Sequence, residues 1–490
     1  MDELRLPFNE IDFLIPVHKF KINFSYVSKK GFPFVREFVL RLVHLAPVES
    51  KNIADYFGFS KNETNEAITN LVELGDLQYN EDGRIELTAQ SQGYFNDLGD
   101  IPLVSNLFEY STILGFELAD YNCVGNKKVR EKWKNALKVE VDTQKLSVSE
   151  KDAKRHFQSQ FYSLIDEGYL DGLKDDEESS SRPSIYKIEL VRKLSQEPLR
   201  VTQTLSLDGN GKQLERDDIE KLKDTTETTS LITLAIHENR KPDNKIEIFS
   251  AMGLLGDRHT HTYFTESQID LRRLIEVRAI NESGLTGYYP FLGQIYAKNN
   301  WDLVLTHFDK VVDQLSKTHL DGLDNLAWIA PADSFWGKSY RLPSCLDSII
   351  KKSRVPGKKA KSLYKPVLYV PVTGENDNRA RRNWENELSG QVKHVHGLVE
   401  GFLEGNVEVL VLPKYFAVVC YHFSSPDNYD VSLPLGFVTT DLEMVSKIAK
   451  EALDYISGLQ GHELPNDIGS IRPNRDSKIS LTKGVPKKVT

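Results

Sequence analysis

The sequence predicts a multidomain protein in which an α+β region is followed by an α/β region. The chain of 490 residues is longer than one hydrophobic core usually organises, so several domains are expected. The amino-terminal part combines amphipathic helices with short strands, whereas longer apolar runs separated by helical patterns begin at Leu199. These changes in the pattern of apolar residues place the predicted domains at 1–100, 101–198 and 199–465, with a polar, basic tail at 466–490.

The composition is that of an ordinary globular protein, because 40% of the residues are hydrophobic and 27% are charged. The net charge of −9 argues against DNA wrapping by the whole surface, but it allows local basic patches. Cys123, Cys345 and Cys420 lie far apart in the sequence, so neither a disulfide framework nor a zinc ribbon is predicted. No window approaches the roughly 18 to 20 apolar residues of a membrane-spanning helix, and no signal-like segment opens the chain. We therefore expect a cytoplasmic protein without a membrane partner.

Three helices and a hairpin are predicted in the first domain. The first helix ends at Pro47 and repeats apolar residues at helical spacing: Phe34, Phe38, Leu42 and Leu45. A short second helix ends at Gly58, and the third begins with Ser60 and Glu63, which form a capping-box pattern. A tight turn at 80–83 then joins two short strands. This order resembles a winged helix-turn-helix.

The second domain repeats part of this pattern. A helix is expected to begin with Ser149 and Asp152 as a capping pair and to end at Gly168. One face of that helix carries Phe157, Phe161, Leu164 and Ile165. Preceding helices are expected within Glu109–Leu137, and "SIYKIEL" (Ser184–Leu190) is expected to form part of a wing. The two domains together thus resemble tandem winged helices.

The α/β region is predicted from apolar runs that suggest buried strands. They are "LRVTQTLSL", "SLITLAIHE", "KIEIFSAM", "NWDLVLTHF", "NLAWIAPADSF", "KPVLYVPVT", "NVEVLVLPKYFAVVCYHF" and "LPLGFVTT". The alternation of strands and helices from Asn325 onward resembles half of a phospholipase D-type fold. In that family a His-x-Lys motif, followed by a Gly-Ser and Asn element, holds a phosphodiester. Lys414 matches the lysine and Gly436 the glycine, but Leu412 stands in place of the nucleophilic histidine. The resemblance thus implies a degenerate domain without a nucleophile.

Two helices and one loop carry the residues predicted to contact DNA. The start of the third helix of the first domain offers Lys61, Asn62, Thr64 and Asn65, and the wing of that domain offers Arg84. The helix of the second domain offers Lys151, Lys154, Arg155 and Gln158. A basic run in the α/β region offers Lys351, Lys352, Arg354, Lys358, Lys359 and Lys361, for which a solvated loop is the alternative interpretation. Glu63 and Glu66 oppose phosphate binding by the third helix of the first domain.

These features favour a non-catalytic DNA-binding accessory protein. The combination resembles accessory subunits of bacterial DNA-processing or phage-defence systems, in which a partner ATPase or nuclease does the chemistry. No catalytic residue, metal ligand or cofactor is predicted, and a homodimer is compatible with the pattern. One alternative is a metal-dependent nuclease or phosphodiesterase with an unconventional site, around His259 and His261 or around Lys414, His422 and Asp427. Another alternative is a winged-helix scaffold that mediates dimerisation or partner assembly.

Overall fold

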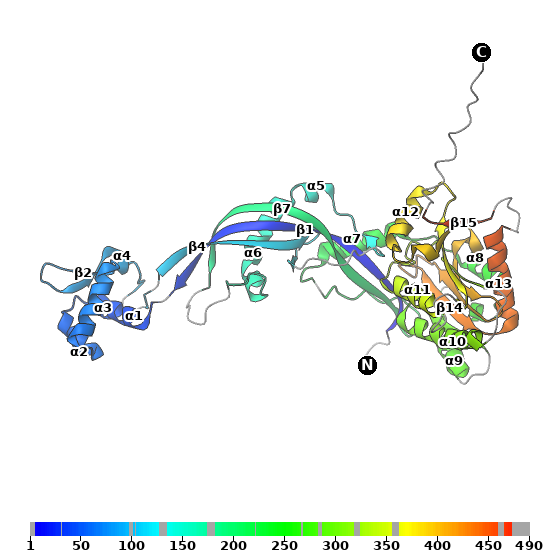
Figure 1. The fold of residues 1–490 in the computed structure, drawn as a ribbon, viewed down its shortest axis with the longest axis horizontal. Helices are drawn as coiled ribbons and strands as arrows, with labels where there is room; N and C mark the ends of the chain where they lie inside the picture. Colours follow the sequence, from blue (N-terminus) through cyan, green and yellow to red (C-terminus); the bar gives the residue numbers. More distant parts are fainter. Residues whose placement is uncertain are drawn as a thin grey trace, which may run out of the picture. The chain divides into compact units, whose positions relative to one another are not determined.

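The chain folds into two compact units with a mixed α/β architecture. The structure is a computed structural model, and it describes residues 5–30, 32–97, 101–102, 104–126, 135–173, 182–220, 222–265, 268–282, 287–317, 324–354, 362–458 and 465–472. Unit 1 comprises Met1–Pro16, Val129–Val141 and Pro198–Thr490, and unit 2 comprises Val17–Lys128 and Asp142–Glu197. The chain passes between the units four times: twice within long strands, β1 (Leu6–Lys30) and β7 (Ser184–Leu207) (Figure 1), and twice at the two ends of Val129–Val141.

Unit 2 is built on an antiparallel ribbon. β4 (Val104–Glu117) pairs with β1 through 14 residue pairs, and β7 pairs with β1 as well. In β1, Phe20, Ile22 and Phe24 are buried and alternate with less buried polar residues, which is the period of a strand. The short β5 (Cys123–Gly125) pairs with β4.

The remaining part of unit 2 that precedes β4 is a helix–hairpin module, which we define as residues 34–95. Its elements are α1 (Phe34–Leu45), α2 (Ser50–Phe57), α3 (Lys61–Glu73), β2 (Leu77–Tyr79), β3 (Ile85–Leu87) and α4 (Ala89–Gln92). The predicted capping box is confirmed, because Glu63 N donates to Ser60 Oγ and Ser60 N donates to Glu63 Oε2. Gly58 ends α2 with φ of 69°, and Gly83 closes the hairpin with φ of 72°. The order of elements in this module is therefore as predicted.

The predicted buried face of α1 is wrong. Phe34 and Leu45 are 69% and 57% exposed, whereas Val39, Leu40 and Val43 are buried against α3 and β3. The helix has apolar residues on more than one face, so helical spacing alone leaves the choice of face open. The choice is made by Ile68, Leu71 and Ile85, which fill the space beside Leu40.

The second helical segment also departs from expectation. α5 (Thr143–Ser147) is capped by Asp142, and α6 (Ser149–Asp166) follows it directly. Val148 is the N-cap of α6, so the predicted Ser149–Asp152 capping pair is wrong. The apolar face of α6 is confirmed, because its four predicted core residues are buried: Phe157, Phe161, Leu164 and Ile165.

Two predicted elements around α6 are strands of the ribbon. Residues 109–117 belong to β4 and not to a helix, while 127–134 lie outside the described residues. Residues 184–190 form the start of β7, which pairs with β1. Long-range pairing decides both segments, and a local pattern does not contain that information.

Unit 1 contains a mixed sheet with the strand order β15-β11-β10-β9-β12-β13-β14-β8. Only the neighbours β9, β10 and β11 are parallel to one another among these described pairs. The strands are β8 (Tyr288–Leu292), β9 (Asn325–Ile329), β10 (Lys365–Val372), β11 (Val395–Val399), β12 (Val407–Leu412), β13 (Phe416–Phe423), β14 (Leu433–Thr439) and β15 (Asp467–Ser470). A short strand, β6 (Leu137–Lys138), pairs with β1.

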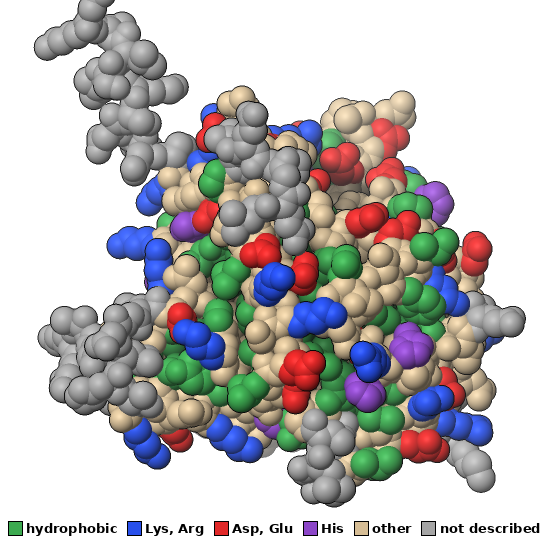
Figure 2. All heavy atoms as spheres, turned by 90° about the vertical axis from the view of Figure 1, so that its right-hand side faces the viewer, with side chains coloured by type: hydrophobic (Ala, Val, Ile, Leu, Met, Phe, Trp, Pro, Cys, Tyr) green, Lys and Arg blue, Asp and Glu red, His purple; other side chains and the backbone are tan. Residues whose placement is uncertain are grey.

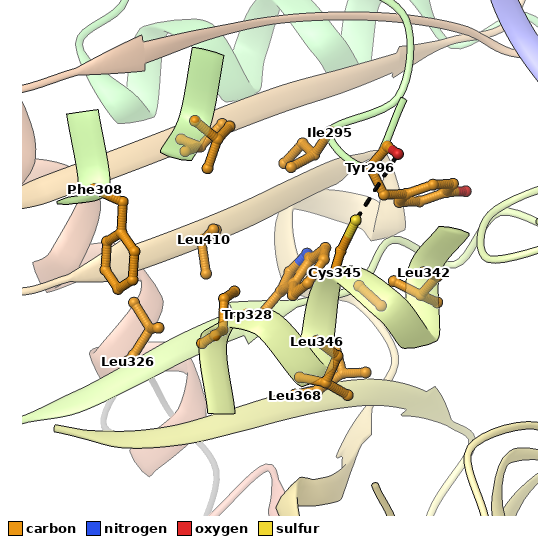
Figure 3. Close-up of a cluster of buried hydrophobic side chains, with 14 of the residues drawn as sticks. Ile295, Tyr296, Phe308, Leu326, Trp328, Leu342, Cys345, Leu346, Leu368 and Leu410 are labelled. Atoms are coloured by element: carbon orange, nitrogen blue, oxygen red, sulfur yellow. Dashed lines mark hydrogen bonds between the residues drawn. The ribbon is translucent and has the colours of Figure 1, made fainter. Parts of the chain in front are cut away.

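Helices cover both faces of this sheet. The main helices are α7 (Thr226–Asn239), α8 (Lys245–Leu255), α9 (Leu271–Glu282), α10 (Lys298–Lys317), α11 (Arg341–Lys352), α12 (Asn378–Glu387) and α13 (Leu442–Ser457). α8 and α13 contact each other and β13 (Figure 1). α10 and α11 pack on a core in which Trp328, Leu346, Leu368 and Leu410 meet (Figure 3). In that core the thiol of Cys345 donates to the carbonyl of Tyr296 at 3.9 Å.

Three segments predicted as strands are helices. "SLITLAIHE" lies in α7, "KIEIFSAM" in α8 and "NWDLVLTHF" in α10. α10 buries Trp301, Val304, Phe308, Val311 and Leu315, which recur at helical spacing over a longer window than the predicted strand. The strand predictions that correspond to β9, β10, β12, β13 and β14 are confirmed. No described helix has both the length and the apolar character needed to cross a membrane.

The close contact of β13, β14 and β8 makes Gly436 the most size-restricted of the described glycines in the strands of this sheet. A Cβ at Gly436 would lie 2.4 Å from Val419 O and 2.6 Å from Phe291 Cζ. We expect Gly436→Ala to lower the free energy of unfolding by about 2 to 3 kcal/mol, because backbone and ring must move apart. Gly253→Ala in α8 is the matched control: its Cβ meets nothing within 4 Å, so a gain of up to about 1 kcal/mol is expected. Urea unfolding measures the free energy of unfolding of both variants. Equal changes in Gly436→Ala and Gly253→Ala would contradict the close packing described at Gly436.

Candidate functional site: a buried histidine between two carboxylates

A histidine and two carboxylates meet inside unit 1. His422 and Cys420 lie on β13, and Glu408 lies on β12 directly opposite Cys420. Because side chains alternate along a strand, His422 and Cys420 point to the same face of the sheet. Asp333 comes from the segment that follows β9. Antiparallel pairing of β12 and β13 thus brings together residues that are distant in sequence.

Hydrogen bonds fix the ring of His422 on both nitrogens. Nδ1 lies 3.0 Å from Asp333 Oδ2, and Nε2 lies 3.3 Å from Glu408 Oε2. Trp328 Nε1 donates to the other oxygen of Glu408 at 2.8 Å. Ser432 Oγ and the backbone N–H of residue 335 donate to Asp333. We call His422, Asp333, Glu408 and Cys420 the histidine cluster.

The cluster holds charge in a dry environment. Burial alone would lower the pKa of His422, but its hydrogen bonds to Asp333, Cys420 and Glu408 raise that pKa well above the ordinary value. Burial alone would raise the pKa of Asp333, but the contacts with His422 and Ser432 lower it. Burial raises the pKa of the Cys420 thiol to about 11. The favoured form is an imidazolium beside a carboxylate and a neutral thiol.

Burial of the histidine cluster limits which molecules can reach its side chains, and so limits its possible chemistry. The side chains of His422 and Glu408 are 1% and 0% exposed, and that of Asp333 is 2% exposed. A polymer cannot reach them without rearrangement of the fold. Glu408, Cys420 and His422 could instead ligate a metal ion, since one potential ligand atom of each lies within 4.8 Å of the others.

The first set of predicted DNA contacts lies on the helix–hairpin module. Lys61, Asn62, Asn65 and Arg84 are exposed, as predicted. Thr64, which was also expected to face DNA, is buried and its hydroxyl donates to Ser60 O. The structure therefore leaves the predicted set accessible around the start of α3 and the hairpin.

The second set lies on one helix. Lys151, Lys154, Arg155 and Gln158 are exposed on α6, opposite its buried apolar face. Lys154 Nζ also donates to Ile188 O in β7 at 3.2 Å. The structure therefore collects this set on one surface.

The basic run of the α/β region is only partly described. Lys351 and Arg354 are exposed, while Lys352 forms an ion pair with Asp309 at 2.6 Å. The other three predicted contacts, Lys358, Lys359 and Lys361, lie outside the described residues. This run belongs to unit 1, whereas the other two sets belong to unit 2. On the face drawn in Figure 2, cationic and anionic side chains are interspersed.

The alternative enzyme sites are not assembled. His259 and His261 are exposed around a 3-10 turn, and Asp257 there accepts backbone N–H groups. Lys414 and His422 lie toward opposite ends of β13, roughly 25 Å apart by strand rise. Asp427 is exposed.

Positions matched to the phospholipase D-type motif are also separated. Lys414 lies in the turn between β12 and β13, with Nζ 3.7 Å from Asp324 Oδ2. Leu412 is buried in the core, and Gly436 pairs with Cys420 within the sheet. The register thus places Gly436 several residues from the turn that carries Lys414.

Sequence reasoning considered His422 but missed its partners. Glu408 is the one charged residue in the apolar run "VEVLVL", and a charge in a strand that is buried on both faces requires a partner. That signal could have singled out Glu408. Asp333 lies outside any strand, and no local pattern pointed to it.

The start of α6 is attached to β1 through His18. Its Nδ1 lies 3.1 Å from Ser149 Oγ, and its Nε2 lies 2.8 Å from Lys193 Nζ. Burial and the neighbouring Lys193 charge lower the pKa of His18. The folded state therefore favours the neutral imidazole, which accepts from Lys193.

This arrangement predicts acid sensitivity of unit 2. Because the folded-state pKa of His18 is below the unfolded value of about 6.5, its contribution to stability is complete well above pH 6.5. That contribution is lost as the pH falls through 6.5 toward the folded-state pKa. We expect Tm to fall between about pH 7.5 and pH 5.5, and to fall less in His18→Gln. Thermal melts followed by circular dichroism at pH 7.5 and pH 5.5 measure this difference. An equal decrease of Tm in the unchanged protein and in His18→Gln would contradict the prediction.

Comparison of the chain with protein-family models, with curated proteins and with solved structures found no match.

Proposed function

We propose that this protein is a non-catalytic nucleic-acid-binding accessory protein, with α6 as its main contact surface. The observation that carries the proposal is the accessible polar side of α6. It presents Lys151, Lys154, Arg155 and Gln158 on a helix whose other side is fixed in the core.

The stripe on α6 suits contact with phosphates. Lys151, Arg155, Gln158 and Tyr162 follow one another at spacings of four, three and four residues, so they lie along one side of the helix. Lys151 and Arg155 form no ion pair with any acidic side chain in the described part of the chain. Tyr162 is 47% exposed and adds an aromatic surface for a base or sugar. Exposed Lys and Arg side chains beside an aromatic ring are residue types that bind a nucleic-acid backbone.

The helix order of the helix–hairpin module supports its interpretation as a winged helix. Val48, between α1 and α2, exchanges two backbone hydrogen bonds with Ile85 of β3 and so forms a one-residue antiparallel bridge beside the two-stranded hairpin. That is an expected feature of a winged helix, in which the hairpin packs beside the helices.

The accessory role follows from the position of the reactive groups. The residue in the position of the family's nucleophile, Leu412, is an apolar core residue. The histidine cluster is closed to solvent. A degenerate phospholipase D-like unit 1 would therefore leave chemistry to a partner, an ATPase or a nuclease of a DNA-processing or defence system.

A second function, partner assembly, is favoured by the surface of the helix–hairpin module. Residues 34–95 contain five Lys and Arg but ten Asp and Glu, a net charge of −5, which repels phosphate. The same module exposes large apolar side chains: Phe34 69%, Tyr56 69%, Tyr79 57% and Leu74 50%. Aromatic side chains within an acidic surface suit a basic protein partner more than DNA. We therefore assign nucleic-acid contact to α6 and partner contact to this module.

Binding of a duplex at two salt concentrations tests the assignment. We expect Lys151→Ala with Arg155→Ala to weaken binding and to reduce the salt slope by about 2, since each phosphate contact contributes about 0.9. Lys154 is kept because its ammonium holds the carbonyl of Ile188. Electrophoretic mobility shift titrations measure both quantities.

The matched control carries the same loss of charge on the helix–hairpin module, as Lys61→Ala with Arg84→Ala. It should bind DNA nearly as the unchanged protein does. A loss confined to the control would transfer the contact to α3, and absence of binding by the unchanged protein would overturn the proposed function.

A further inference from the structure

We propose that Glu408, Cys420 and His422 bind one divalent transition-metal ion, with Zn²⁺ preferred, as a structural centre of unit 1. This inference is independent of nucleic-acid binding, because it concerns residues that are closed to solvent. It rests on the spacing of the ligand atoms, on their outer hydrogen-bond partners, and on two buried carboxylates that no Lys or Arg of the described residues pairs with.

The first element is the distance between His422 and Glu408. Charge-assisted N–H···O bonds are usually about 2.7 to 2.9 Å long, whereas Nε2 and Oε2 are 3.3 Å apart. Two ligands of a tetrahedral zinc ion at about 2.0 to 2.1 Å lie roughly 3.4 Å from each other. The separation found here is therefore closer to that of two ligands on one ion than to that of a short ionic hydrogen bond.

The second element is the set of outer partners. Metal-bound histidine usually gives its other nitrogen to a carboxylate, and Nδ1 of His422 faces Asp333 Oδ2 at 3.0 Å. The oxygen of Glu408 that is farther from the ring accepts from Trp328 Nε1. These contacts hold the imidazole and the carboxylate so that Nε2 and Oε2 point toward each other.

The third element is charge. Asp333 and Glu408 are both buried, and no described Lys or Arg forms an ion pair with either one. Lys241 is the candidate for a cationic partner of Asp333, but its ammonium donates to Gly405 O and Asn406 Oδ1. A buried carboxylate needs a cation beside it, which is here either the imidazolium of His422 or a bound metal ion.

The donor set indicates which ion is suitable. A thiolate, an imidazole and a carboxylate are all ligands that Zn²⁺ accepts in proteins. Binding would release the thiol proton of Cys420 and the Nε2 proton of His422, so affinity should rise with pH.

The test is metal content of the full chain, purified without chelators and dialysed against zinc. We expect one tightly held zinc ion per chain by mass spectrometry, and a Tm higher by at least about 5 °C than after chelator treatment. Replacement of zinc by Co²⁺ should give a thiolate-to-cobalt charge-transfer band. Cys420→Ser should abolish that band, and His422→Gln should reduce metal content.

Two matched variants separate a metal site from general damage. Cys345→Ser alters another buried thiol of the same core, and His396→Gln alters a histidine that contacts Asp467. Both should retain the zinc and the cobalt band. Substoichiometric zinc in the unchanged protein would overturn the proposal, even if Cys420→Ser failed to fold, and so would a cobalt band that survives in Cys420→Ser.

Discussion

The contact between His422 and Asp333 is the constraint around which the centre of unit 1 is organised. It joins the end of β13 to the segment after β9. Ser432, the residue before β14, donates a hydrogen bond to the same carboxylate of Asp333. Removal of one partner of such a buried pair typically costs about 3 to 5 kcal/mol, because an uncompensated charge remains. The sheet can therefore tolerate charges in its interior only while all of these segments keep their places.

The surroundings of His422 extend this constraint to the other face of the sheet. Asn244, at the start of α8, donates to the carbonyl of His422 and to Asn406 Oδ1, and its own oxygen accepts from Ser424 N. The side chain of one asparagine thus satisfies backbone groups at the end of β13. Polar contacts fix this end of the strand, whereas apolar packing around Trp328 fixes its middle.

The buried histidine cluster and the surfaces proposed for binding are located in different units of the chain. The histidine cluster is buried in unit 1 and contributes to the internal order of that unit. The exposed side of α6 and the acidic helix–hairpin module belong to unit 2. Because α6 is held by His18 and Lys193 at its start and by its apolar face along its length, its exposed side chains are presented on a fixed support. Substitutions that change the charge of the exposed side of α6 therefore leave the apolar core beneath the helix intact.

Local sequence signals determined those elements whose physics is local. The capping box of Ser60 and Glu63, the glycine at the end of α2 and the turn at Gly83 depend on a few adjacent residues, and each was predictable. The long apolar runs of β12 and β13 were equally clear, because strands buried on both faces need no polar alternation.

Tertiary structure decided everything that depends on a distant partner. The buried face of α1 is set by Ile68 and Ile85, and residues 109–117 form a strand because β1 pairs with them. The histidine cluster is the clearest case: Asp333, Glu408 and His422 are up to 89 positions apart, and only strand pairing brings them into contact. The sequence by itself determined local conformation and the exposed charges, since these depend on neighbouring residues. Only the fold decided which buried charges meet, because a buried charge is stable only beside the partner that the topology supplies.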